Sequence, residues 1–279
     1  MTSKTARRSP TIAVLGLGKA GGSLLSSARA ANIDVLAAAA RFAGLRRTLR
    51  WRQADVLFLA VPDDALPELV RELALSAREQ RSRTLPRLIA HLSGAQGASA
   101  LAALAPFASI GTFHPLAALD GDSASAARTF VAVDARPRSA QRTLSSLARR
   151  MGLLPGFVAE EDRVRYHAGA VVAGNLATAL LYAGVQLLTR SGVPEIVARE
   201  SLARLLSSTA HNAIAHRLPQ ALTGPVARGD RDTIARHCAL LAAENAPLLS
   251  SYRALSLLLI DEVSRHDQAT KRKLRKALG

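Results

Sequence analysis

The chain has little cysteine and few aromatic residues. Of its 279 residues one is a cysteine, Cys238, and 4% are aromatic. A single cysteine excludes an internal disulfide framework and a cysteine-based zinc site. No apolar run reaches roughly 18 residues, which argues against an ordinary membrane span, and the basic N-terminus leads into a strand pattern rather than a signal peptide. These absences predict a soluble, cytoplasmic protein with no membrane partner.

Acidic residues are also scarce, with 21 Asp and Glu against 37 Lys and Arg, for a net charge of +16. A strongly basic chain invites a nucleic-acid hypothesis. The basic residues are mostly arginines spread along the chain, and many alternate with alanine in the pattern of solvated helix faces. We therefore expect no nucleic-acid partner. The hydrophobic fraction of 49% is ample for a core, and the length suits one large or two ordinary domains.

The first part of the chain alternates short apolar runs with amphipathic segments. The runs predict strands at residues 11–15, 34–39, 55–61, 87–92, 109–113, 129–133 and 153–158. Amphipathic segments such as 64–78 and 140–151 separate several of them. Alternation of this kind indicates a mostly parallel sheet covered by helices.

Beyond residue 160 the pattern becomes helical. A long stretch without proline covers 162–190, and further helices are predicted at 194–216, 231–241 and 246–265. We therefore predict two domains: an α/β Rossmann-type domain over residues 1–160, which binds the cofactor, and an all-α domain over 161–279, which serves the substrate and dimerisation. The helical stretch 168–188 is apolar on more than one face, so a partner chain is expected to cover it and form a homodimer.

A glycine-rich turn follows the first predicted strand. The turn has the pattern G-x-G-x-x-G and leads into a helical pattern, and it comprises Gly16, Leu17, Gly18, Lys19, Ala20 and Gly21. In such turns one glycine permits the tight turn, one lets a pyrophosphate approach the backbone, and one lets helix and strand pack closely. The helix N-terminus adds free N–H groups and the positive end of its dipole. The segment predicts a dinucleotide site.

Arg41 lies just after the second predicted strand, where an NAD-specific site usually places an acidic residue for the ribose 2′-hydroxyl. A guanidinium suits a 2′-phosphate instead. The sequence therefore predicts NADP rather than NAD. Val61 and Pro62 close the third strand at the edge where ligands bind in open parallel sheets, and we expect them to border the cofactor.

Four ordered motifs, at residues 91–94, 111–116, 166–175 and 221–230, carry a family resemblance. Over residues 10–262 the chain resembles a family of oxidoreductases in which a Rossmann-like domain is joined to a helical domain of unknown function 2520. That family lies within the superfamily of 6-phosphogluconate dehydrogenase and pyrroline-5-carboxylate reductase. The resemblance implies the fold and an oxidoreductase activity, but no single reaction. Some relatives are linked to ketopantoate reduction.

The resemblance also suggests catalytic residues. Ser93 and His114 follow neighbouring predicted strands, and they resemble a Ser and a His that handle the substrate hydroxyl and its proton in prephenate and 3-hydroxyacyl-CoA dehydrogenases. His167 and Asn175 lie on the first helix of the second domain. Related enzymes carry a catalytic Lys four residues before the Asn, but Val171 stands there in this chain. We therefore expect His114 or His167 to donate the proton, with His114 favoured, and Ser93 and Asn175 to orient the substrate.

Substrate contacts are expected from Gly94, beside Ser93, and from a loop that interrupts the helical half. In that loop Thr223 and Gly224 begin a turn, Arg228 offers a fork for a carboxylate, and Asp230 is expected to cap the next helix. The histidines show no metal-ligand spacing, so no metal is predicted.

Three functions remain open at this point. The first is NADP-dependent reduction of a small 2-oxo acid, with a ketopantoate-like substrate as a candidate. The second is reduction of an imine of the pyrroline-5-carboxylate type, which needs less proton donation because an iminium already carries its proton. The third is an NADP-binding regulator that has lost catalysis, which the substitution by Val171 would explain.

Overall fold

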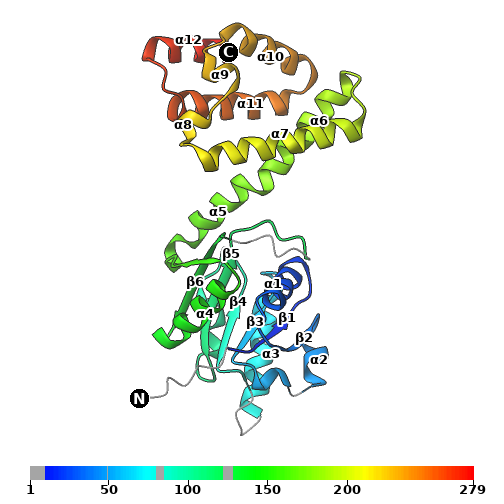
Figure 1. Ribbon diagram of the computed structural model, residues 1–279, viewed down its shortest axis with the longest axis vertical. Coiled ribbons are helices and arrows are strands. Elements are labelled where there is room, and N and C mark those ends of the chain that lie inside the picture. Colours follow the sequence, from blue (N-terminus) through cyan, green and yellow to red (C-terminus); the bar gives the residue numbers. More distant parts are fainter. Residues whose placement is uncertain (1–9, 49, 80–84, 122–127) are drawn as a thin grey trace. The chain divides into compact units, whose positions relative to one another are not determined.

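The computed structural model describes residues 10–48, 50–79, 85–121 and 128–279. The chain forms two compact units, Met1–Gly174 and Asn175–Gly279 (Figure 1). A boundary at residue 160 was expected where the strand pattern ends. The compact division falls at residue 174. The helix that follows residue 160 belongs to the first unit because its side chains, such as Arg163 and Tyr166, contact the sheet.

A seven-stranded sheet forms the centre of the first unit. Its strands lie in the order β2-β1-β3-β4-β5-β6-β7. The strands are β1 (Ile12–Leu15), β2 (Val35–Ala39), β3 (Val56–Leu59), β4 (Leu88–His91), β5 (Ser109–Pro115), β6 (Phe130–Arg136) and β7 (Leu154–Gly156). Neighbouring strands are parallel except for β5 and β6, which are antiparallel. The predicted mostly parallel sheet is confirmed, with each expected strand at its place.

Helices cover both faces of the sheet (Figure 1). Their ranges are α1 (Lys19–Ala30), α2 (Phe42–Arg46), α3 (Leu66–Glu79) and α4 (Arg138–Arg150), with short 3-10 turns η1 (Arg50–Gln53), η2 (Ala98–Leu104) and η3 (Glu160–Asp162). Alternate residues of β1 face opposite sides. Ile12 and Val14 pack with α1 and α4, while Ala13 and Leu15 pack with α2, α3 and η2. The strands are therefore buried on both faces, which explains their near-continuous apolar sequence.

The second unit is all helical, as predicted. Its helices are α6 (Asn175–Arg190), α7 (Glu195–Ala215), α8 (Leu218–Ala221), α9 (Gly224–Arg228), α10 (Arg231–Glu244), α11 (Ala246–Leu258), the π-turn η4 (Leu259–Val263) and α12 (Gln268–Leu278). A small apolar core joins α9 to α12 and η4, and it includes Ile234, Cys238, Ile260 and Leu274. Within the unit α6 and α7 bury little of their own surface, with Val185 and Ala198 as their buried residues.

The predicted long helix over residues 162–190 is divided. Helix α5 (Arg163–Ala173) ends at Gly174, and α6 begins at the next residue. His167 and Asn175 therefore lie on two successive helices, and not on the single helix to which the sequence assigned them.

One segment of the chain bears on the expected absence of a membrane span. The segment Glu160–Arg190 is long and apolar enough to cross a membrane, by length and composition alone. No Asp, Glu, Lys or Arg lies between residues 166 and 189, but polar residues such as Asn175 and Thr178 interrupt the apolar run. One such helix is weak evidence for a span. Because 6% of its apolar window is buried among the described residues, the segment presents exposed apolar surface.

Candidate functional site

The carboxyl ends of the parallel strands meet at one edge of the sheet. The pairing registers place Leu15, Leu59, His91 and Thr112 in one row across β1, β3, β4 and β5. The residues that follow each member of this row therefore lie at the same edge. The strand order changes direction between β1 and β3, and ligands of open parallel sheets bind at such a point. The edge holds the glycine turn together with Ser93 and His114, two of the predicted catalytic residues.

Two of the three roles expected of the glycine turn are visible in the structure, and the third, the approach of a pyrophosphate, stays a prediction. Gly16 has a φ of +99°, and a Cβ there would lie 2.2 Å from the carbonyl oxygen of Ala60. A Cβ on Gly21 would lie 1.9 Å from the carbonyl oxygen of Gly16. At Gly18, by contrast, no atom of the described residues lies within 4 Å of the added Cβ. Gly16 and Gly21 are required by the turn and the helix packing, whereas Gly18 leaves its surroundings open to a ligand.

Helix α1 begins directly at this open position. Gly18 is its N-cap, and no side chain among the described residues caps the first turn. Its N-terminal N–H groups are therefore available to an anion, at the positive end of the helix dipole. The segment after β5 packs beside the same turn, because Gly121 N–H donates to Ser23 Oγ at 3.0 Å. The other cofactor candidates in the turn, Leu17 and Lys19, are exposed, and Ala20 is half-buried.

The remaining cofactor candidates border this region. Arg41 comes directly after β2, whose end pairs with the end of β1, and it is the exposed N-cap residue of α2. Val61 and Pro62 follow β3 beside Ala60. The residues that could hold an NADP pyrophosphate and 2′-phosphate thus lie at the ends of β1, β2 and β3.

Two histidines converge on Gly94. A Cβ on Gly94 would lie 2.7 Å from Nε2 of His114 and 2.6 Å from Nδ1 of His167. The centroids of the two imidazole rings lie 5.9 Å apart, and the rings are nearly perpendicular, at 81°. Glycine at this position lets the loop after β4 approach both rings. Of the predicted catalytic residues, the structure brings His114 and His167 together, and Ser93 adjoins Gly94 in the chain.

Tyr166 supports the first of these histidines. Its hydroxyl lies 2.9 Å from Nδ1 of His114 and 3.3 Å from the carbonyl oxygen of the same residue. Burial, and then the neighbouring His167 and Arg163, lower the pKa of His114 to about 4. Burial raises the pKa of Tyr166 to about 12. At neutral pH the His114 imidazole is therefore neutral, so it is a hydrogen-bond partner rather than a ready imidazolium acid.

Arg163 is a buried cation beneath the histidines. Its side chain is 0% exposed, and its Nη2 donates to Thr112 Oγ1 on β5. Among the described residues its Nε and Nη1 have no hydrogen-bond partner. Burial lowers the pKa of Arg163, and the Asp134 carboxylate opposes that shift. Because a guanidinium keeps its charge in proteins, Arg163 adds a fixed positive charge that favours neutral imidazoles at His91 and His114.

Ser93 is held by a hydrogen-bond network at the end of β4. Its hydroxyl donates to Asp63 Oδ2 at 2.8 Å and accepts from Gln96 N–H at 3.1 Å. Its own N–H donates to Nδ1 of His91 at 3.1 Å, and His91 Nε2 lies 2.8 Å from the carbonyl oxygen of Gly97. The two contacts fix His91 as the neutral tautomer with its proton on Nε2. Burial lowers the pKa of His91 in the same sense.

Four predicted site residues lie in the second unit. Asn175 begins α6, Thr223 is the N-cap of α9, Gly224 has a φ of +85°, and Arg228 ends α9. Asp230 accepts from Thr233 N–H at 3.1 Å, so its predicted role as cap of α10 is confirmed. The roles of the other four in substrate binding stay predictions.

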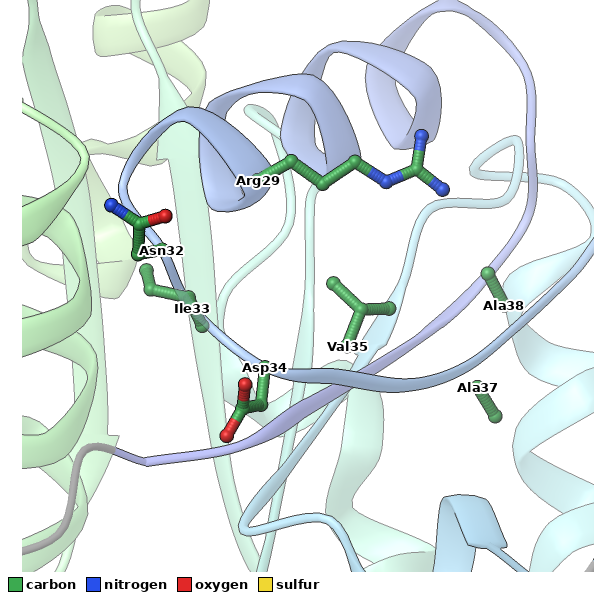
Figure 2. Close-up of a pocket in the computed structure, with 7 residues that line it drawn as sticks. All are labelled: Arg29, Asn32, Ile33, Asp34, Val35, Ala37 and Ala38. Carbon is green, nitrogen blue, oxygen red and sulfur yellow. The ribbon is translucent and has the colours of Figure 1, made fainter.

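A separate hollow of about 500 Å³ lies between the end of α1 and the edge strand β2 (Figure 2). It is lined by Arg29, Asn32, Ile33, Asp34, Val35, Ala37 and Ala38. None of the histidine or serine side chains of the site reaches it, and we assign it no part in the chemistry. Within the described ranges no three His, Cys, Asp or Glu residues gather in a way that could hold a metal ion.

Several residues of this site were not among the sequence candidates. Asp63 directly follows Val61 and Pro62, so the rule that placed those two residues at the sheet edge would have placed Asp63 there as well. Tyr166 lies inside a motif that was recognised, next to His167. No sequence signal distinguishes Arg163 among the many arginines of the chain.

Two family models match the chain. Residues 44–118 match a Rossmann-like domain, and residues 129–258 match the domain of unknown function 2520. The glycine turn precedes the first matched range. No curated protein matches the sequence.

Solved structures share the fold along almost the whole chain. A proposed NADP oxidoreductase of Bacteroides fragilis is 17% identical with a TM-score of 0.67, covering 96% of this chain and 98% of its own. A 1-pyrroline-5-carboxylate reductase of Streptococcus pyogenes is 13% identical with a TM-score of 0.59, covering 96% and 99%. An imine reductase of Myxococcus stipitatus, in complex with NAD+, is 15% identical with a TM-score of 0.55, covering 95% and 99%. At these identities the likeness establishes the fold.

Proposed function

We propose that this chain, in which a Rossmann-like domain is followed by a domain of unknown function 2520, is an NADP-dependent reductase of a small acid with a C=N or C=O bond. One observation carries the proposal. An open glycine turn at a free helix N-terminus lies at the same sheet edge as Ser93 and the histidine pair. Such an edge places a dinucleotide beside groups able to bind and orient a reducible substrate. The reductases among the structural neighbours agree with it.

The glycine turn would hold the pyrophosphate, and Arg41 the 2′-phosphate. The nicotinamide supplies the hydride when it is bound. The residues of the chain must then bind the substrate, orient its reducible carbon and manage one proton. Ser93, His114 and His167 are the groups for that task, and Asn175, Thr223 and Arg228 are further candidates from the second unit.

Two substrate classes fit the site to different degrees. A 2-oxo acid, such as a ketopantoate-like substrate, needs a proton donor for the developing alkoxide. His114, with a pKa of about 4, is neutral where such a donor should be protonated. An iminium brings its own proton, and the carboxylate of Asp63 lies 2.8 Å from Ser93 to balance its charge. The geometry therefore favours the imine, with the oxo acid as the second candidate.

The proposal is tested with a panel of 2-oxo acids and cyclic imines, each with NADPH and with NADH. We expect loss of reduced nicotinamide absorbance with NADPH and a cyclic imino acid. Turnover of oxo acids alone would reverse the order of the two classes. Tight NADPH binding without turnover of any panel member would favour the regulator.

Arg41 provides a prediction about cofactor choice. Because charge-assisted hydrogen bonds contribute about 1.5–3 kcal/mol, Arg41→Ala should weaken NADP binding roughly 10- to 100-fold and leave NAD binding unchanged. Isothermal titration with both nucleotides measures the difference, with Arg142→Ala on the exposed surface of α4 as the control. Equal affinities for NAD and NADP in the wild type, unchanged in Arg41→Ala, would contradict the prediction.

We also propose that the protein is a homodimer formed through the second unit. Large apolar side chains on α6 and α7 are exposed, among them Leu180 at 48% and Leu205 at 61%. At about 25 cal/mol per Å² of apolar surface, a second copy that covers them gains substantially. Light scattering should give twice the mass of the chain, and Leu180→Glu with Leu205→Glu should give a monomer. Leu75→Glu on α3, exposed at 51%, is the matched control. A wild-type monomer at micromolar concentration would contradict the proposal.

A further inference from the structure

The hydroxyl of Ser93 has a fixed polarity. A hydroxyl group has one hydrogen to donate and two lone pairs that accept. The hydrogen is directed to Asp63 Oδ2 at 2.8 Å, because a carboxylate oxygen only accepts. One lone pair accepts from Gln96 N–H at 3.1 Å. What remains is a single lone pair, so Ser93 can accept a hydrogen bond from a substrate but has no hydrogen to give.

Asp63 is positioned to impose this polarity. It follows β3 at the switch point of the sheet, two residues after Val61, and Gln96 Nε2 donates to its carbonyl oxygen at 3.4 Å. The serine is 8% exposed, whereas the aspartate is exposed. The negative charge also reaches His114, since Asp63 opposes the lowering of the His114 pKa.

We propose that Asp63 is a specificity-determining residue that acts through Ser93: together they form an acceptor that selects a substrate carrying a cationic N–H over one carrying a neutral carbonyl. The inference rests on the proposed reductase function and deepens it, because it assigns the preference for an iminium to a named pair. A protonated imine donates its N–H to the free lone pair of Ser93 and lies beside a carboxylate. A carbonyl oxygen has only lone pairs, which cannot form a hydrogen bond with the free lone pair of Ser93. To bind a carbonyl oxygen, the Ser93 hydroxyl must first break its hydrogen bond to Asp63.

The size of the preference follows from the charge. A hydrogen bond with a charged partner is favourable enough to change affinity by about 10- to 100-fold. Removing the carboxylate should weaken the affinity for the cation by about 10- to 100-fold. It should do the opposite for an ether or carbonyl oxygen, because the Ser93 hydroxyl is then free to donate. A purely structural role of Asp63 would weaken both ligands together.

The test uses two unreactive probes, pyrrolidine-2-carboxylate and tetrahydrofuran-2-carboxylate, which differ in a ring NH₂⁺ against a ring oxygen. Binding of each to the full-length protein is measured by calorimetry with NADPH, because the reduced cofactor cannot oxidise the amine probe. We expect the wild type to prefer the amine probe at least 10-fold. Asp63→Asn should reduce that preference about 10-fold or more, and Asp63→Ala should raise the affinity for the oxygen probe. Asp64→Asn, one residue further along, is the matched control and should keep the wild-type preference.

The outcomes separate this inference from the proposed function. Equal binding of the probes to the wild type, no binding of either, or an unchanged preference in Asp63→Asn overturns the role of Asp63. A parallel loss of affinity for both probes in Asp63→Ala, with an altered unfolding transition, overturns it in favour of a structural role. Failure of the reductase proposal would appear elsewhere, as absent NADPH binding and absent turnover on the substrate panel.

Discussion

Gly18→Ala should fold as stably as the wild type and bind NADP about 100-fold more weakly. The added Cβ would have no atom of the described residues within 4 Å, and the backbone at Gly18 has a φ of −69°, which alanine adopts freely. The methyl group would instead occupy the open space in front of the α1 N-terminus, where the pyrophosphate must approach the backbone. Overlap of this kind typically costs 1–3 kcal/mol or more. Calorimetric titration with NADP measures the loss.

Gly21→Ala is the contrasting variant. Its Cβ would lie 1.9 Å from the carbonyl oxygen of Gly16 and 3.2 Å from Cβ of Ala60, so β1 and α1 would have to separate. We expect destabilisation of about 3 kcal/mol or more. Trp51 is the one tryptophan of the chain and is buried in the sheet domain, so its fluorescence follows unfolding of that domain. If Gly18→Ala binds NADP with the affinity of the wild type, the glycine turn does not bind the cofactor.

The sheet could be predicted because its strands are buried on both faces. Apolar runs that end at glycine, proline or a polar residue mark such strands in the sequence, and the observed β1 to β7 coincide with them to within a few residues at each end. The antiparallel pairing of β5 and β6 could not be predicted in this way, because a buried strand has the same composition in either direction. Pairing depends on contacts distant in sequence.

The site could be predicted in part. Ser93 and His114 were found because each follows a predicted strand, and all parallel strands end at one edge. In the structure β5 extends to Pro115, so His114 lies within the last two residues of the strand. The same rule applied to the residue after Pro62 would have found Asp63, but two consecutive aspartates after a proline also suggest a polar loop. The break at Gly174 has a weak signal, since an isolated glycine is tolerated within helices. The burial of Arg163 and its contact with Thr112 depend on tertiary packing, and no sequence pattern at either residue indicates them.

Acidification should destabilise the sheet domain through His114. Its pKa is about 4 in the folded protein, against 6.5 for an unperturbed histidine. Between those two values the unfolded chain binds more protons than the folded chain, so the free energy of unfolding falls as the pH drops. At 1.36 kcal/mol per pKa unit the loss from this group approaches about 3 kcal/mol by pH 4. The contribution is complete above pH 6.5, and burial of His91 adds to the loss in the same direction.

His114→Asn removes the titrating ring and keeps a hydrogen-bonding side chain, so it should flatten this pH dependence. Urea unfolding between pH 4 and pH 7, followed by the fluorescence of Trp51, measures the slope in the sheet domain alone. His211→Asn, at an exposed position on α7, is the matched control and should keep the wild-type slope. An identical slope in His114→Asn and the wild type would show that His114 is not buried as a neutral imidazole. In that case His114 would again qualify as the protonated donor that reduction of an oxo acid requires.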